Sequence, residues 1–137
     1  MIKEEYKYSE ITEKIIGCAM RVHQRMRNGY PELIYHRCLA IELNKMNLSF
    51  STEIELPIFY DNIPVGKRRV DFLIESKVII EIKALSELTD AHFAQALNYL
   101  EVMNLEIGLL INFGSKSLQV KRLINSKYKS PQSNQSV

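Results

Sequence analysis

The two stretches that decide the fold are VDFL at residues 70–73 and VIIEIKA at residues 78–84. Each places an acid, Asp71 or Glu81, inside an apolar run, where an ionised carboxylate is costly unless a partner stabilises it. Residues two apart on a strand share a face, so Glu81 and Lys83 should project together. The pattern therefore predicts two adjacent strands that bring charged groups to one place.

The loop between these two strands decides whether the two acids meet. A two-residue turn would direct the carboxylates to different faces, whereas a three-residue loop over 75–77 pairs Ile74 with Val78. We predict the second register, which sets Asp71 opposite Glu81 with their β-carbons about 4.5–5.5 Å apart. Ionised carboxylates at that separation repel each other unless a proton or a metal ion compensates their charge. We therefore expect a hard cation that prefers oxygen ligands to bind between them.

Apolar spacing and turn residues predict the remaining elements. We expect helices over 9–26, 32–46 and 90–103, strands over 50–60, 68–74, 77–83 and 107–113, and a short strand or helix over 118–124. Ser9 or Thr12 is expected to cap the first helix. Asp61, Asn62 and Pro64 supply turn chemistry between the first two strands. The resulting order is α-α-β-β-β-α-β, which predicts an α/β fold.

Length and composition indicate one domain. The chain has 137 residues, 46% of them apolar, which suits a single core over residues 1–125 followed by a flexible basic and polar tail over 126–137. No stretch approaches the roughly 20 apolar residues of a membrane span, and the N-terminus is charged, so a cytoplasmic location is expected. Cys18 and Cys38 lack metal or disulfide spacing and are expected to be free thiols.

Positive charge is concentrated at the end of the chain. The net charge is +2, but from Gly114 onward there are five basic residues and no acidic one, which leaves the preceding part at −3. This basic segment is compatible with holding a phosphate backbone near a metal site. A solvated tail explains it equally well.

Glu32 supplies a third carboxylate. It shares a helical stripe with Tyr35, Leu39 and Leu43, so the acid lies on a face otherwise suited to packing. On its own it could be a helix cap or a partner of the helix dipole. Its combination with Asp71 favours a role in the same site.

Gly29, Glu32 and Tyr35 spell the motif GxxExxY, preceded by VHQ at residues 22–24 and followed by the two strand motifs. From Thr12 to Ile124 the chain resembles the GxxExxY protein family, a branch of the PD-(D/E)xK nuclease-like superfamily. The resemblance implies a restriction-endonuclease-like core, in which helices flank a mixed central β-sheet. It also implies a Mg²⁺- or Mn²⁺-dependent nuclease that hydrolyses phosphodiester bonds. The resemblance carries no particular substrate, and DNA is the one we expect.

The resemblance also assigns roles to the site residues. Asp71 and Glu81 look like metal ligands, Glu32 like an additional helix acid that joins them as a ligand of the metal, and Lys83 like the residue that orients or activates the attacking water or stabilises negative charge. Arg69 and Val70 stand where the usual proline of the motif would be, which removes one confirmation.

A later helix carries Gln95 and Tyr99 as QxxxY, which resembles a motif of the RecB-like exonuclease branch. This assigns Gln95 to the catalytic group and Tyr99 to substrate contacts. His92 shares their helical face, which either looks toward the site or forms a partly exposed helix side. Arg68 and Arg69 are candidates for contacts with flanking phosphates, or are solvated strand residues.

Other side chains are expected to have simpler roles. We expect Glu53 and Glu55 to form the wet side of the first strand, and His36 to pack or to lie on the surface. Two alternatives to the nuclease remain. The chain could be a catalytically silent nucleic-acid-binding or protein-interaction module with the same fold. The acids could also form a structural ion-pair cluster with Lys83 inside an oligomer interface, in a homodimer or a complex with a partner protein.

Overall fold

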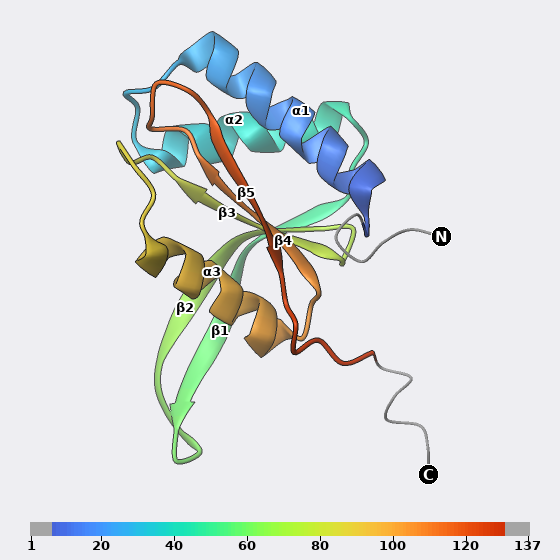
Figure 1. Cartoon of the computed structure of the whole chain (residues 1–137), viewed down its shortest axis with the longest axis vertical. Helices are drawn as coiled ribbons and strands as arrows, with labels where there is room; N and C mark the ends of the chain where they lie inside the picture. The colour runs from blue at the N-terminus through green and yellow to red at the C-terminus, as the bar shows by residue number, and fades with distance from the viewer. Residues whose placement is uncertain (1–6, 131–137) are drawn as a thin grey trace.

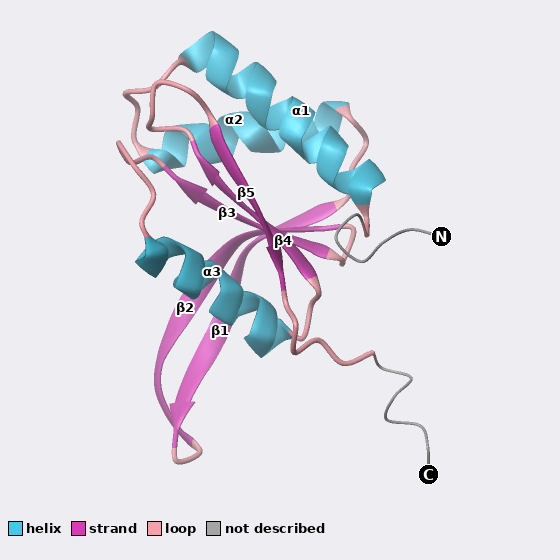
Figure 2. Ribbon diagram, in the orientation of Figure 1, coloured by secondary structure: helices cyan, strands magenta, loops and turns pink. Residues whose placement is uncertain are grey.

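The computed structural model describes residues 7–130, and over this part of the chain the helices and strands form an α/β domain (Figure 1, Figure 2). The elements are α1 (Ser9–Met26), α2 (Glu32–Lys45), β1 (Phe50–Tyr60), β2 (Ile63–Ile74), β3 (Val78–Lys83), α3 (Asp90–Met103), β4 (Ile107–Asn112) and β5 (Gln119–Ile124). The strands make one sheet in the order β1-β2-β3-β4-β5. All neighbouring pairs are antiparallel except β3 and β4, which are parallel and are connected through α3. The predicted mixed sheet flanked by helices is confirmed.

Helices cover both faces of the sheet. α1 and α2 lie together over one face, apart from α3 (Figure 1), and their apolar stripes bury Phe72, Ile80 and Leu109 of the strands. α3 covers the other face, where Tyr99 packs with Ile79. All six residues of β4 are buried, as expected for a strand with a helix layer on each side.

β1 and β2 form a long hairpin that extends beyond the rest of the sheet (Figure 1). Only residues 72–74 of β2 pair with β3, so the remainder of β2 has β1 as its sole strand neighbour among the described residues. We call residues 57–66, at the end of this hairpin, the arm. The turn of the arm consists of Asp61 and Asn62, which both have positive φ.

Two local predictions were wrong. β2 begins at Ile63 rather than Arg68, and Pro64 lies in the strand opposite Phe59 instead of in the turn, because the two-residue turn already reverses the chain. Proline is tolerated where a strand has a free edge. The residue before α1 is Tyr8, and no side chain caps that helix; the Thr12 hydroxyl instead donates to the Ser9 carbonyl oxygen at 3.2 Å.

The undecided segment at residues 118–124 is a strand, β5. After it, the side chain of Asn104 holds the backbone of Lys129 through two hydrogen bonds of 2.9 and 3.0 Å. The start of the expected flexible tail is therefore anchored against the end of α3, while residues 131–137 lie outside the described residues.

Cys18 and Cys38 are both free thiols, as predicted. None of the helices within residues 7–130 combines the length and apolar character that a membrane crossing requires.

Candidate active site at the gap between β2 and β3

The hairpin of β1 and β2 twists sharply where it passes the site. On β2, Phe72 packs against α1 and α2, whereas Val70, two residues earlier and on the same side of a regular strand, packs against α3. Glu53 lies opposite Asp71 in the pairing of β1 with β2. Its positive φ of 52° departs from strand geometry, and the regular pairing of the two strands is interrupted at this residue. This rotation separates β2 from β3 just beyond their last paired residues.

The pairing of β2 with β3 has the predicted register. Ile74 lies opposite Val78 and Phe72 opposite Ile80, so continuing the register brings Asp71 opposite Glu81. At that point the ladder stops, and the two carboxylates replace the missing backbone partners. The backbone N–H of Asp71 donates to Oε1 of Glu81 at 3.0 Å, and the backbone N–H of Ile82 donates to Oδ2 of Asp71 at 2.7 Å. The two acids are thus locked together by the strands that carry them.

Burial raises the proton affinity of the acid pair. Glu81 is only 5% exposed. Burial, and then the neighbouring charge of Asp71, raise the pKa of Glu81 to about 8. Burial also raises the pKa of Asp71, although the Ile82 amide and the charges of His36 and Lys83 oppose the change. At neutral pH the pair therefore retains a proton unless another cation takes its place.

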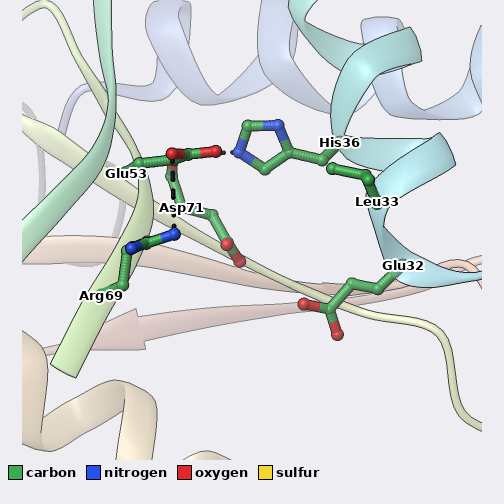
Figure 3. A pocket seen from close by; sticks show the side chains of 6 residues that line it. All are labelled: Glu32, Leu33, His36, Glu53, Arg69 and Asp71. Atoms are coloured by element: carbon green, nitrogen blue, oxygen red, sulfur yellow. Dashed lines mark hydrogen bonds and ion pairs between the residues drawn. The ribbon is translucent and has the colours of Figure 1, made fainter.

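A pocket of about 300 Å³ opens beside Asp71 (Figure 3). Its lining residues come from α2, β1 and β2 and are Glu32, Leu33, His36, Glu53, Arg69 and Asp71. Glu32 is the first residue of α2, and its carboxylate faces the pocket. Burial, and then the charge of Asp71, raise the pKa of Glu32, whereas the charge of Lys83 lowers it. The helix acid therefore lies within electrostatic reach of the strand acids.

The side chains of Lys83 and Gln95 lie next to each other. The Lys83 ammonium donates to Oε1 of Gln95 at 3.5 Å, which links β3 to α3. The charge of Lys83 lowers the pKa of each of the acids Glu32, Asp71 and Glu81. Lys83 is therefore placed to offset part of the negative charge of the pocket.

The other predicted substrate residues lie at the edge of this group. Tyr99 is 5% exposed and belongs to the core beneath α3. Burial raises its pKa, and the nearby Arg68 opposes the change. Arg69 lines the pocket but forms ion pairs with Glu53 at 3.6 Å and Glu55 at 3.9 Å. His92 completes a capping box with Thr89 at the start of α3, where its Nδ1 accepts from the Thr89 N–H at 3.0 Å.

Sequence reasoning missed three residues around the site. Glu53, expected on a wet strand face, lines the pocket. His36 stacks on Phe72 with ring centroids 4.3 Å apart, and its Nε2 lies 3.4 Å from the carbonyl oxygen of Asp71. Asn112 is fully buried opposite Lys83, and its side chain binds both the N–H and the carbonyl of Leu85 at 2.9 Å. None of these residues has a motif that would single it out.

The donor set suits a hard divalent cation bound by few protein ligands. Within residues 7–130, no three Asp, Glu, His or Cys side chains converge closely enough to enclose a metal ion by themselves. Asp71 and Glu81 nevertheless present adjacent carboxylates that already require a positive charge. Mg²⁺ is commonly held by one or two carboxylates, with water and substrate phosphate completing its shell. The residues therefore fit Mg²⁺ better than a metal that needs a complete protein cage.

The mixed sheet with its strand acids, lysine and helix acid defines a nuclease-like α/β domain. A family model described as the PD-(D/E)XK nuclease superfamily matches residues 9–123, and the chain belongs to this superfamily. The family suggests a nuclease, and nucleases of this class typically use divalent metals.

A solved structure supports the same fold. The crystal structure of SSO0001 matches with a TM-score of 0.55 and 23% sequence identity over 67% of this chain and 48% of that chain. The chain thus spans about half the length of SSO0001, and the likeness is one of fold. No curated protein matches the chain.

Proposed function

We propose that the chain is a divalent-metal-dependent nuclease of the GxxExxY branch that hydrolyses phosphodiester bonds in DNA. The observation that carries the proposal is the pair of hydrogen bonds that locks Asp71 and Glu81 together where β2 and β3 separate. A structural ion pair would place opposite charges there, whereas this arrangement places two like charges side by side. Such an arrangement is stable only with a proton or a cation between the acids.

In this proposal Asp71 and Glu81 hold Mg²⁺ or Mn²⁺, and Glu32 adds negative charge from the opposite wall of the pocket. A bound divalent ion supplies charge stabilisation at phosphorus and lowers the pKa of an attacking water. Glu32 is not close enough to make a three-ligand cluster with the strand acids. It is better suited to binding a water molecule, either one that the ion also binds or the one that attacks phosphorus.

Lys83 supplies the positive charge that the reacting phosphate needs. When water attacks phosphorus, negative charge builds on the phosphate oxygens, the bond to the leaving ester oxygen breaks, and that oxygen takes up a proton. An ammonium on the same strand face as Glu81 stabilises the developing charge. Gln95, at 3.5 Å from the Lys83 nitrogen, limits where the ammonium can lie. Arg68, Arg69 and Tyr99 are proposed to contact the substrate beside the reacting phosphate.

A second candidate is a nucleic-acid-binding module that does not cleave. The raised pKa of Glu81, about 8, favours it, because the acid pair can hold a proton in place of a metal ion at neutral pH. The two candidates differ in what the acid pair does, since a binding module needs no cation there to function.

The test is incubation of the purified protein with single- and double-stranded DNA and RNA in Mg²⁺, Mn²⁺ or EDTA. The variants are Glu81→Gln and Lys83→Ala, with Lys14→Ala as a matched control, because Lys14 is an exposed lysine on α1, outside the site and the basic C-terminal segment. The nuclease proposal requires metal-dependent cleavage that both site variants lose and the control retains. Binding that persists in EDTA, without cleavage by the wild type, would establish the binding module instead.

A further inference from the structure

A column of aromatic rings leads from the core to the surface beside the candidate site. The rings of Phe113 and Tyr35 stack with centroids 4.9 Å apart, and both residues are fully buried. Tyr30 meets Tyr35 edge-on with centroids 6.1 Å apart, and Tyr30 is 48% exposed. At the inner end, the backbone N–H of Phe113 donates to the carbonyl oxygen of Lys83 at 2.8 Å. The column therefore connects the strand that carries Lys83 to an exposed tyrosine.

Tyr30 is held in place by its neighbours. Its backbone N–H donates to the hydroxyl of Tyr35 at 3.2 Å, and that hydroxyl donates to the carbonyl oxygen of Arg27. Pro31 is extended and leads directly to Glu32, whose carboxylate faces the pocket (Figure 3). The Cα atoms of Tyr30 and Glu32 are therefore separated by about 7 Å at most. The exposed tyrosine is thus a fixed neighbour of the helix acid.

Two loops without acidic residues meet at this edge of the sheet. They are residues 27–31, between α1 and α2, and residues 113–118, between β4 and β5. Next to them, Nε2 of His23 lies 3.0 Å from the carbonyl oxygen of Ser115 and joins the end of α1 to the second loop. β3 and β4 are parallel, and both end at this edge (Figure 1). Open α/β sheets generally bind their ligands at such an edge.

Each loop also presents a cation that no acid neutralises. Arg27 and Lys116 are exposed, and neither forms an ion pair within residues 7–130. Other basic residues of the C-terminal segment are engaged elsewhere, since Arg122 donates to a hydroxyl of α1 and Lys127 forms an ion pair with α3. The positive charge at the edge of the sheet therefore lies beside Tyr30.

We propose that this edge binds an unpaired DNA strand, with one base stacked on Tyr30 and neighbouring phosphates bound by Arg27 and Lys116. The choice of DNA rests on the function proposed above, but binding here needs neither a metal ion nor cleavage. Aromatic side chains beside cations bind single strands because every base offers a π-face and every linkage a phosphate. In a duplex the faces of the bases are already stacked on each other, so Tyr30 favours an unpaired strand.

Fluorescence anisotropy of a labelled DNA strand of about 12 nucleotides tests the edge, with the strand either single or annealed to its complement. EDTA prevents metal-dependent cleavage during the measurement. The variants are Tyr30→Ala and Tyr30→Phe, and the matched control is Tyr60→Ala, because Tyr60 is a 72% exposed tyrosine on the arm. Wild type, Tyr30→Phe and the control should bind the single strand more tightly than the duplex. Tyr30→Ala should raise the dissociation constant for the single strand by about tenfold or more.

Salt dependence tests the two cations. Arg27→Ala and Lys116→Ala should each reduce the steepness of log affinity against log salt concentration by about 0.7, the value for one phosphate contact on a single strand. Lys14→Ala is the control, since Lys14 is an exposed lysine near the other end of α1, and it should leave the slope unchanged. Unchanged slopes in both cation variants would remove the phosphate contacts from the proposal.

Tyr30→Leu provides a second variant in case Tyr30→Ala fails to fold, because leucine keeps an apolar contact with Tyr35, and it should weaken binding in the same direction. A wild type that does not bind the single strand, or binds the duplex at least as tightly, overturns the proposal. Single-strand binding that both variants leave unchanged also overturns it. Binding that depends on Tyr30 without cleavage in Mg²⁺ would refute the nuclease and keep this site, whereas cleavage unaffected by both variants would refute this site and keep the nuclease.

Discussion

Replacing Glu81 by glutamine should stabilise the metal-free protein at alkaline pH, although the residue lies at the centre of the candidate site. The pKa of Glu81 is raised from 4.5 to about 8, first by burial and then by the charge of Asp71. The folded protein therefore keeps this proton up to about pH 8, whereas the unfolded chain releases it near pH 4.5. Between these values the folded state binds more protons, so the free energy of unfolding falls as the pH rises.

The slope of the free energy of unfolding against pH gives the size of the expected effect. One proton corresponds to about 1.4 kcal/mol per pH unit, so the whole loss is at most about 5 kcal/mol. Because Asp71 shares the titration with Glu81, we expect about 2–4 kcal/mol. Glutamine keeps an oxygen that can accept the Asp71 amide but cannot lose a proton. The variant should match the wild type near pH 5 and exceed it near pH 8, by about 10 °C in melting temperature.

Urea denaturation followed by circular dichroism, in EDTA from about pH 5 to about pH 8.5, measures this difference. The control is Glu13→Gln, since Glu13 is an exposed acid on α1. The control should leave the pH dependence of the wild type unchanged. A wild type whose free energy of unfolding rises with pH, or a Glu81→Gln variant that is equally destabilised at every pH, would refute the reasoning.

Mg²⁺ should raise the melting temperature of the wild type more at pH 8 than at pH 6, because protons compete with the ion for the acid pair. Asp71→Asn should abolish this effect, and a wild-type melting temperature that does not respond to Mg²⁺ would contradict it. Gln95→Ala should lower cleavage about tenfold without changing thermal stability, and unchanged cleavage would mean that Gln95 does not position Lys83. Gly114→Ala should destabilise the fold by about 3 kcal/mol or more, since its Cβ would lie 2.3 Å from backbone atoms of the loop after β3. Gly66→Ala, with nothing within 4 Å, is its control, and equal unfolding midpoints would refute the steric argument.

The pairing at the centre of the site was predictable because few alternatives bury the right residues. A shift of one residue between β2 and β3 would turn Phe72 and Ile80 out of the core. That cost selects the three-residue loop, and the structure has the resulting pairs. The proximity of Asp71 and Glu81 follows directly from this register.

Other parts of the site depend on geometry that no local pattern records. Glu53 alternates with Glu55 like any pair of solvent-facing acids, and it reaches the pocket because the hairpin twists at a residue with positive φ. His36 approaches Asp71 through the packing of α2 over β2. Pro64 was misplaced because proline is common in turns, whereas the free edge of the arm admits it in a strand.

The two amides that donate to carboxylates give the candidate site a spectroscopic signature in the main chain. The N–H groups of Asp71 and Ile82 face side-chain oxygens whose charge changes with protonation or with a bound ion. Their resonances in a two-dimensional amide spectrum should therefore move together during a titration, while those of the paired residues farther along β2 stay in place. Ionisation of the acids can thus be followed residue by residue without a substrate.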